Sequence, residues 1–470
     1  MADPLLFLSI VEIRAWLAAG RLNPVDLAER HLARIAEVEP RLAAFQLVDA
    51  ERARAMAEAS AARWQAGRPL SPLDGVPLTI KDNVDVRGWP TRNGSVTTTD
   101  TPAAGDAPVV ARLREAGAVF LGKTTTPEFG WKGLTDSRLR GAPTRNPWNT
   151  GRTPGGSSGG AAAALAVGVG ALAFGNDGGG SIRIPAAFSG VFGMKPNFGR
   201  VPHVPLEGFF ATVVAGGPLT RNVADAALAL AVMAGPDARD WYGLPLPEAG
   251  WLDNLVPRLT GLRVAYAPEL GGVEPDNAVR AVVDAAIARL RTAGATIGEP
   301  GRVISPLKPA FEAFWTASFA ARMRSLPASQ WDVVDPGYVA VARQGMDVGV
   351  DAVLDGERNR ARLHRELILV FEAYDLLLTP TTPHAAPSVD TEYHAQGYDR
   401  WRDGVPYTLP FNLTGHPAAS IPCGLTSDGL PVGLQVVGPR FAERAVLEAC
   451  AGIEALLGFN AIREARMAAF

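Results

Sequence analysis

The pattern of apolar and polar residues changes several times along the chain, and it begins with helices. Ser9 followed by Glu12 has the pattern of a capping box, in which two side chains satisfy free backbone amides at a helix start. Asn23, with Pro24 and Asp26 after it, gives a second start, because proline is tolerated in the first helical turn. We therefore expect two opening helices that act as scaffold.

From Gly75 the pattern changes to short β-rich runs separated by turns. The run GVPLTI predicts a strand that delivers Lys81 at its end, where a charged residue often has a function. Asp106 is placed to cap a helix through PVVARLREAG, and the apolar run from Ala118 to Leu121 predicts the next strand. This alternation of strand and helix indicates an α/β fold.

Residues 152–184 contain two glycine-rich loops. The first loop leads into an alanine-rich helix, the short strand ALAFG follows, and the second loop enters the segment SIRIP. Open α/β sheets place their sites at the ends of strands. We therefore expect the two loops to meet there.

Residues 236–373 are richer in Trp, Arg and amphipathic helical stretches such as NAVRAVVDAAIARLRTAG, and they carry few β signals. We expect a helical layer over the sheet. The β pattern returns in YDLLLTP, ASIPCG and GLPVGLQVVG, and a helix through AVLEACAGIEALL closes the chain. Because no repeat or low-complexity linker marks a boundary, we expect residues 1–470 to form a single large domain.

Composition narrows the class of protein. Hydrophobic residues make up 47% and charged residues 20% of the 470 residues, as in ordinary globular proteins. The formal net charge is -3, and both signs are scattered, so no basic stripe suggests a nucleic-acid partner. A small neutral or weakly charged substrate fits better.

Signals for export, membrane insertion and metal binding are weak. The N-terminal segment lacks a cationic start and is interrupted by Glu12 and Arg14, so we expect a cytoplasmic protein. The uncharged run from Thr153 to Asn176 consists of Ala, Gly and Ser, which favours a buried helix and strand over a membrane span. Two cysteines and six scattered histidines give no disulfide framework or metal spacing, and we expect no cofactor.

Two familiar motifs occur by accident. Gly117 to Thr124 satisfies the phosphate-binding loop pattern GxxxxGK[ST], but its variable positions are Ala, Val, Phe and Leu. These residues predict a buried strand rather than a flexible turn with inward-pointing amides. Gly168 to Ala173 imitates a dinucleotide fingerprint, yet it follows an alanine-rich helix where that motif needs a strand.

The remaining chemical signal is distributed over three segments: PLTIKDNVD with Lys81, GGSSGG at residues 155–160, and GNDGGGSIRIPA at residues 175–186. Together they resemble the amidase-signature family. The segments DAPVVARLREAGAVFLGKT, TPEFG, YDLLLTPTTP, PFNLTGHPAASIP and GLPVGLQVVGP also look like family segments. The resemblance covers most of the chain outside roughly residues 236–373.

The resemblance implies a mixed central β-sheet covered by helices on both faces, in one domain. It also implies a catalytic triad, with Ser181 as nucleophile, Ser157 as a proton relay held by an unusual cis peptide, and Lys81 as general base. The oxyanion hole is then assigned to the backbone amides of Gly178, Gly179, Gly180 and Ser181. Glycines there would let the substrate carbonyl approach closely.

The triad makes a demand on Lys81. A lysine accepts a proton only when it is neutral, so its pKa must fall well below the usual value of about 10.4. Burial away from carboxylates would have this effect. The hypothesis therefore requires Asp82 and Asp85 to point away from the Lys81 ammonium.

Other residues are expected to support the site. Ser158 can hydrogen-bond within its loop, and Asp177 with Arg183 can form an ion pair that fixes the nucleophile turn, provided that the pair is buried. Gly130 and Trp131 match positions that face substrate in related enzymes, although a core position is the alternative for the tryptophan. Asn176 is expected to line the same substrate pocket. Two residues depart from the family pattern: Asn176 stands where a hydroxyl residue is common, and Gly178 where threonine or an aliphatic residue is common. The smaller residue at 178 would enlarge the acyl pocket or loosen its geometry.

The expected reaction is hydrolysis of a carboxylic amide C–N bond through an acyl-enzyme on Ser181, with aryl or hydrophobic amides favoured. A carbamate or ester hydrolase with the same triad, the amidase subunit of a tRNA-dependent amidotransferase, and a noncatalytic binding protein are the alternatives. The intact triad argues against the last. We expect a monomer or homodimer. Five aromatic residues either line an apolar substrate pocket or belong to the core between helices: Phe311, Phe314, Trp315, Trp331 and Tyr338.

Overall fold

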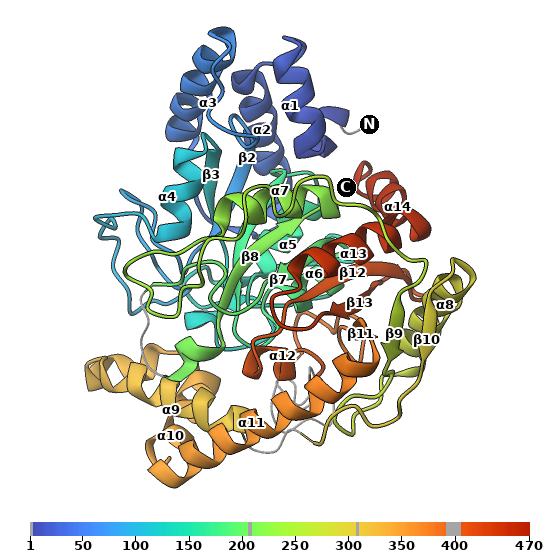
Figure 1. Ribbon diagram of the computed structural model, residues 1–470. Helices are drawn as coiled ribbons and strands as arrows, with labels where there is room; N and C mark the ends of the chain where they lie inside the picture. Colours follow the sequence, from blue (N-terminus) through green and yellow to red (C-terminus); the bar gives the residue numbers. More distant parts are fainter. Residues whose placement is uncertain (1–2, 205–208, 307–309, 392–405) are drawn as a thin grey trace.

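The computed structural model describes residues 3–204, 209–306, 310–391 and 406–470. Within these residues an 11-stranded mixed sheet runs through the molecule, with helices on both faces (Figure 1). The strand order is β1-β3-β2-β6-β8-β7-β12-β13-β11-β9-β10. A separate two-stranded hairpin joins β4 (Asp136–Ser137) to β5 (Ala142–Pro143). The expected α/β architecture with a mixed central sheet is confirmed.

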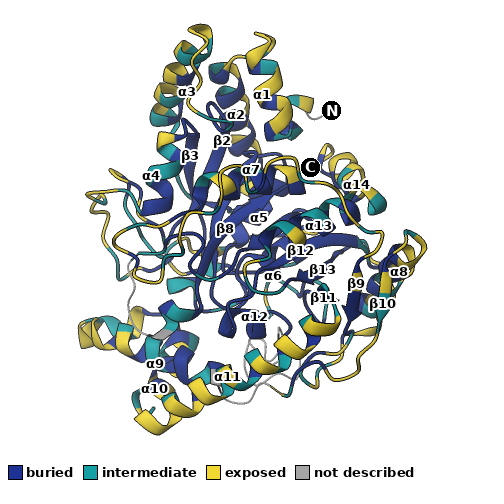
Figure 2. Ribbon diagram, viewed as in Figure 1, coloured by how far each residue is buried: buried dark blue, intermediate teal, exposed yellow. Residues whose placement is uncertain are grey.

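The strands of the large sheet are short and mostly buried on both faces (Figure 2). Parallel pairing joins β2 to β3 and β6, and β9 to β10 and β11, whereas the other neighbouring pairs are antiparallel. Their bounds are β1 Phe45–Val48, β2 Pro77–Lys81, β3 Val119–Thr124, β6 Leu172–Asp177, β7 Phe192–Lys195, β8 Ala215–Thr220, β9 Arg263–Tyr266, β10 Thr296–Gly298, β11 Leu376–Pro380, β12 Ala418–Leu425 and β13 Pro431–Val437.

One face of the sheet packs against a hydrophobic cluster, and five helices contribute most of its helical residues. These helices are α1 (Ile10–Ala18), α4 (Pro108–Glu115), α7 (Val223–Met233), α8 (Asn277–Thr292) and α13 (Glu443–Leu457). Buried apolar side chains of the strands and helices interlock there, which removes a large apolar area from water.

The other face is covered by the helices that carry the glycine-rich loops and by the outer helices. The alanines of α5 pack directly against this face, since small side chains allow a helix to approach closely. Helices α9 to α11 form a group below the sheet in Figure 1. The bounds on this side are α2 Pro24–Leu42, α3 Ala50–Gln65, α5 Gly159–Ala166, α6 Arg183–Ser189, α9 Ala310–Arg324, α10 Pro336–Met346, α11 Val350–Ala373, α12 Leu409–Leu413 and α14 Phe459–Met467.

Local signals in the sequence found most of these elements. The Ser9–Glu12 capping box is present at the start of α1, and Asn23 caps α2. Gly117 to Thr124 forms buried strand β3 with its preceding turn, as its apolar residues predicted. The prediction for Asp106 is wrong: α4 begins after Ala107 without a side-chain cap. Asp106 instead accepts hydrogen bonds from the Arg87 amide and the Arg114 guanidinium.

Residues 236–373 contain helices α8 to α11, but they also supply β9 and β10 at one edge of the sheet. Runs of four and three residues between helices are too short to give a clear strand pattern.

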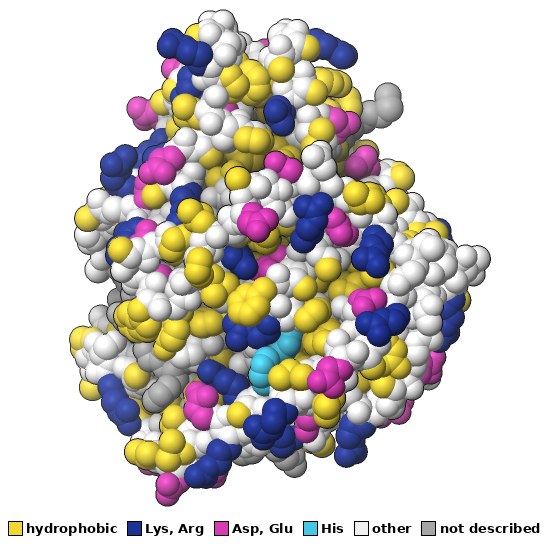
Figure 3. Space-filling view, in the orientation of Figure 1, with side chains coloured by type: hydrophobic (Ala, Val, Ile, Leu, Met, Phe, Trp, Pro, Cys, Tyr) yellow, Lys and Arg dark blue, Asp and Glu magenta, His cyan; other side chains and the backbone are white. Residues whose placement is uncertain are grey.

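No single helix in the described ranges is long and apolar enough to cross a membrane. The pair α13 and α14, bent by 66° at the break between them, reaches the required length and apolar composition only when the two helices are taken together. On the face in Figure 3, Lys and Arg side chains are interspersed with Asp and Glu.

Candidate active site

Two parallel strands deliver polar side chains to one edge of the sheet. β2 and β6 are hydrogen-bonded neighbours, with Ile80 opposite Phe174. Lys81 is the last residue of β2, and Asn176 and Asp177 end β6. Because parallel strands end on the same side, their last side chains lie close together, as expected for a site in an open sheet.

Lys81 lies fully buried between two partners. Its Nζ lies 2.7 Å from Ser157 Oγ and 2.8 Å from Asn176 Oδ1. Burial disfavours the charged ammonium and lowers the pKa of Lys81 to about 7, against a smaller opposing effect of the Asp177 charge. A substantial fraction of this lysine is therefore neutral near pH 7, as a general base requires.

The two aspartates beside Lys81 in the sequence do not pair with it. Asp82 forms a buried ion pair with Lys123, with 3.4 Å between Oδ1 and Nζ, and accepts backbone amide hydrogen bonds. Asp85 is exposed to solvent, whereas Lys81 is buried. Asp82 lies in the turn that follows β2, where Lys123 and two backbone amides hold its carboxylate. The arrangement meets the demand that the sequence placed on this lysine.

The first glycine-rich loop holds Ser157 against the second. The peptide bond between Gly156 and Ser157 is cis. The amide of Ser158 donates a 3.2 Å hydrogen bond to the Ser181 carbonyl, which ties the two loops together, and Ser158 Oγ lies 3.5 Å from the Asn176 carbonyl. A Cβ at Gly130 would lie only 3.2 Å from Ser157 Oγ, so Gly130 borders the proposed relay serine.

Ser181 stands at the end of the second loop, immediately before α6. It is 8% exposed, so solvent still reaches this otherwise buried turn. Within the described ranges its hydroxyl makes no hydrogen bond. A hydroxyl that is not committed to a structural contact is available for reaction.

One of the four proposed oxyanion-hole amides already has a partner within the chain. The amide of Gly180 donates a 2.7 Å hydrogen bond to Asp177 Oδ1, so it is already engaged. The reason is the tight turn, in which the Asp177 carboxylate also accepts from the Ile182 and Arg183 amides. The amides of Gly178, Gly179 and Ser181 donate to no group in the part of the chain that the structure describes.

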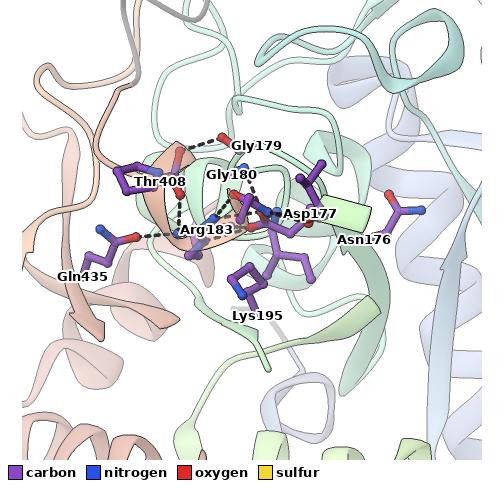
Figure 4. Close-up of polar contacts among 12 residues, drawn as sticks. Asn176, Asp177, Gly179, Gly180, Arg183, Lys195, Thr408 and Gln435 are labelled. Atoms are coloured by element: carbon purple, nitrogen blue, oxygen red, sulfur yellow. Dashed lines mark hydrogen bonds and ion pairs between the residues drawn. The ribbon is translucent and has the colours of Figure 1, made fainter. Parts of the chain in front are cut away.

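Asp177 and Arg183 form a fully buried ion pair beneath the loop (Figure 4). Arg183 Nε and Nη2 donate to the two carboxylate oxygens at 3.0 and 2.9 Å. Burial alone would raise the pKa of Asp177, but the charge and hydrogen bonds of Arg183 outweigh it and hold that pKa below its usual range. The pair therefore meets the condition under which it can fix the turn.

Three supporting residues escaped sequence analysis, because they lie far along the chain. Arg183 also donates to Gln435 Oε1 at 2.7 Å and to Asn412 Oδ1 at 2.6 Å. Thr408 Oγ1 donates to the Gly179 carbonyl at 2.6 Å (Figure 4). A glutamine within the apolar strand GLQVVG was a signal that could have pointed to one of them. A buried amide side chain needs hydrogen-bond partners, so its presence in such a strand indicates a buried polar contact.

Another buried lysine, Lys195, lies close to this network (Figure 4). Burial, followed by the nearby Arg183 charge, lowers its pKa to about 7 as well. Its Nζ donates to the Pro196 carbonyl at 3.1 Å, and no hydrogen bond links it to Ser157 or Ser181 among the described residues. Geometry therefore distinguishes Lys81 from Lys195 as the candidate base.

Aromatic residues form a cluster beside the two loops. Trp131 is 8% exposed and meets Tyr338 edge-on, with ring centroids 6.5 Å apart. Phe311, Phe314, Trp315 and Tyr338 are buried in a core cluster that includes Ile184 and Phe188 of α6, and Trp331 packs against its margin. Phe210 and Phe129, which the sequence had not singled out, also pack against this cluster.

The chain matches known proteins over most of its length. The family model for amidases matches residues 26–447. An acylamidase from Rhodococcus erythropolis is 37% identical over 466 residues, covering 96% of this chain and 95% of the relative. The A-type subunit of a glutamyl-tRNA(Gln) amidotransferase from Symbiobacterium thermophilum is 36% identical, covering 94% and 95% of the two chains. The solved structure of a bacterial aryl acylamidase superposes with a TM-score of 0.91 over 100% of both chains, at 27% identity.

Proposed function

Because this chain belongs to the amidase family and is an amide hydrolase, we propose that Ser181 is its nucleophile, Ser157 its proton relay and Lys81 its general base. The observation that carries the proposal is the 2.7 Å contact between Lys81 Nζ and Ser157 Oγ, made by a buried lysine whose pKa is about 7. A hydroxyl becomes an effective nucleophile only when a nearby base takes its proton.

The proposed reaction has two stages. Lys81 takes a proton from Ser157, and Ser157 takes one from Ser181 as the Ser181 oxygen attacks the amide carbon. The tetrahedral intermediate collapses when the relay returns a proton to the leaving nitrogen, which breaks the C–N bond. Water then attacks the acyl-enzyme by the same proton route and frees the carboxylic acid.

The negative oxygen of the intermediate needs donors that are already in place, each worth about 3 to 4 kcal/mol of barrier. We assign this function to the backbone amides of Gly178, Gly179 and Ser181, which donate to no other described group. Asp177 and Arg183 hold the loop, and Asn176 orients Lys81.

The proposed substrate is a small-molecule amide with an aryl or hydrophobic group, and no cofactor takes part in the mechanism. The group α9 to α11 within residues 236–373 lies next to the loops, and we assign it a share of the substrate pocket. We also propose a cytoplasmic monomer or homodimer. The same acyl-enzyme chemistry accepts carbamates and esters, which remain alternative substrates.

The amidotransferase alternative has support from the 36% identity to the Symbiobacterium thermophilum protein. That relative's name describes one component of a complex, so this alternative predicts that amide hydrolysis depends on a partner. Purified protein that turns over small amides at full rate alone would argue for the free-standing hydrolase. Activity that appears only after a partner co-purifies would favour the amidotransferase.

A pH profile tests the base. We expect kcat/KM for a p-nitroanilide to rise with pH and to level off above about 7, because only neutral Lys81 accepts the proton and its pKa lies near that value. Lys81→Met should lower kcat/KM by about 10²- to 10⁴-fold and should abolish its rise with pH. Lys195→Met is the matched control, since its pKa is also lowered to about 7 without contact to either serine. If Lys195→Met abolishes the rise with pH and Lys81→Met keeps it, the assignment is wrong.

A substrate panel tests the bond class. Purified protein is incubated with p-nitroanilides and with p-nitrophenyl esters and carbamates. In a separate sample a fluorophosphonate probe is added, and the phosphonylation of Ser181, in which its oxygen displaces fluoride from phosphorus, is followed by mass spectrometry. Faster release from anilides, relative to their spontaneous hydrolysis, supports the amidase. No turnover and no labelling of Ser181 would oppose the proposed catalytic role.

A further inference from the structure

The space beside Gly178 is filled by an aromatic ring from a distant part of the chain. A Cβ built on Gly178 would lie 2.4 Å from Cζ of Phe210 and 3.0 Å from Cε1 of the same ring. No side chain fits there while the ring keeps its position. Where the family pattern commonly has a threonine or aliphatic residue, this chain therefore has a glycine covered by Phe210.

The ring is held from behind by α9. Phe210 belongs to the short helix η3 (Phe209–Val213), and its amide donates a 3.0 Å hydrogen bond to Ser318 Oγ. The ring meets Trp315 edge-on, with centroids 4.7 Å apart, and lies 6.0 Å from Phe319. Trp315 and Phe319 are buried, so the position of Phe210 is set by a packed aromatic group.

The two serines define which side of a bound amide the ring faces. Ser157 must point toward the leaving nitrogen in order to protonate it, and Gly130 borders this serine. The three atoms nearest to a Cβ at Gly178 all belong to Phe210 and none to Ser157, and the Gly178 amide is a proposed oxyanion donor. With the leaving amine held on the Ser157 side, the part of the substrate left to approach Gly178 is the acyl part. Phe210 is half-buried, so part of its ring remains accessible.

We propose that Phe210 sets acyl specificity by closing the acyl side of the site at Gly178, so that the substrates are amides of short acyl groups. This inference rests on the proposed function of Ser181. The absence of a side chain at 178 does not enlarge the acyl pocket, because the ring occupies the space that a larger residue would take. Gly178 and Phe210 thus act as a complementary pair.

The test compares acetyl and hexanoyl p-nitroanilide in wild type and Phe210→Ala. We expect the hexanoyl-to-acetyl ratio of kcat/KM to rise at least about tenfold in the variant, because each methylene accommodated in an apolar pocket changes discrimination by about tenfold or more. Phe210→Leu keeps an apolar contact with Trp315 and should shift the ratio in the same direction by less. Phe459→Ala is the matched control and should leave the ratio unchanged, because Phe459 is a buried ring that packs on Trp148 in a different hydrophobic cluster, which contains no residue of α9 to α11.

A second arm tests the pair directly. Gly178→Ala should lower kcat/KM for both anilides at least about tenfold, since the new Cβ meets the ring, and Phe210→Ala should restore activity in the double variant. Unchanged hexanoyl-to-acetyl ratios in both Phe210 variants, with normal fluorophosphonate labelling of Ser181, would overturn this inference alone. Failure of wild type to label Ser181 would remove the proposed function and this inference with it.

Discussion

Replacing Ser181 with alanine is expected to lower kcat for amide hydrolysis by on the order of 10⁴- to 10⁶-fold, while the protein stays folded. The activity falls because the acyl-enzyme cannot form. The fold persists because the hydroxyl makes no hydrogen bond within the described part of the chain. The measurement is p-nitroaniline release together with the urea midpoint of unfolding.

Ser189→Ala is the matched control for this experiment. Ser189 is also buried and lies on α6, but among the described residues its hydroxyl donates one hydrogen bond, to the Pro154 carbonyl at 3.4 Å. We expect its activity to stay within a few-fold of wild type. A Ser181→Ala protein that keeps about a tenth or more of wild-type kcat would falsify the assignment of this serine as nucleophile.

Asp177→Asn is expected to destabilise the protein by about 3 to 5 kcal/mol, because the change leaves the buried Arg183 charge without its carboxylate. The pKa of Asp177 is held below its usual range. Its stabilising charge is therefore present above the unfolded-state pKa of about 4 and is lost as the pH falls. Urea unfolding at pH 7 and at lower pH should show a difference from wild type that shrinks in acid.

Two further variants separate the charge effect from a general loss of packing. Asp177→Asn combined with Arg183→Met should cost less than the sum of the single changes, because neither charge is then left alone. Asp355→Asn breaks an exposed pair with Arg358 and should change the free energy of unfolding by less than about 0.5 kcal/mol. Equal effects of Asp177→Asn and Asp355→Asn on the free energy of unfolding would mean that the buried pair contributes no more to stability than the exposed pair.

The sequence predicted those parts of the site that local patterns specify. Lys81 ends a strand whose apolar run is visible in the sequence, and the two serines lie in glycine-rich loops that are equally visible there. The same local reasoning placed the caps of α1 and α2 correctly. It was wrong at Asp106, because the Arg87 amide and the Arg114 guanidinium donate to that carboxylate, and the helix begins one residue later than expected.

Long-range contacts account for what the sequence did not predict. Three of the partners of Arg183 lie more than two hundred residues away, and nothing near them marks the connection. Phe210 is closer to Gly178 in the sequence, but it is held in place by Ser318 of α9, 108 residues further on. The engagement of the Gly180 amide depends on the turn geometry of Asp177, which a string of glycines does not specify.

The wide sequence separation of the Arg183 partners also bears on how the enzyme is made. Lys81, Ser157 and Ser181 all leave the ribosome in the first half of synthesis, but Asn412 and Gln435 follow only near the C-terminal end of the chain. Until they arrive, Arg183 lacks two of the groups that hold it beneath the nucleophile turn. We therefore expect a partly synthesised or C-terminally truncated chain to carry the proposed catalytic residues without two of the groups that hold Arg183 in place.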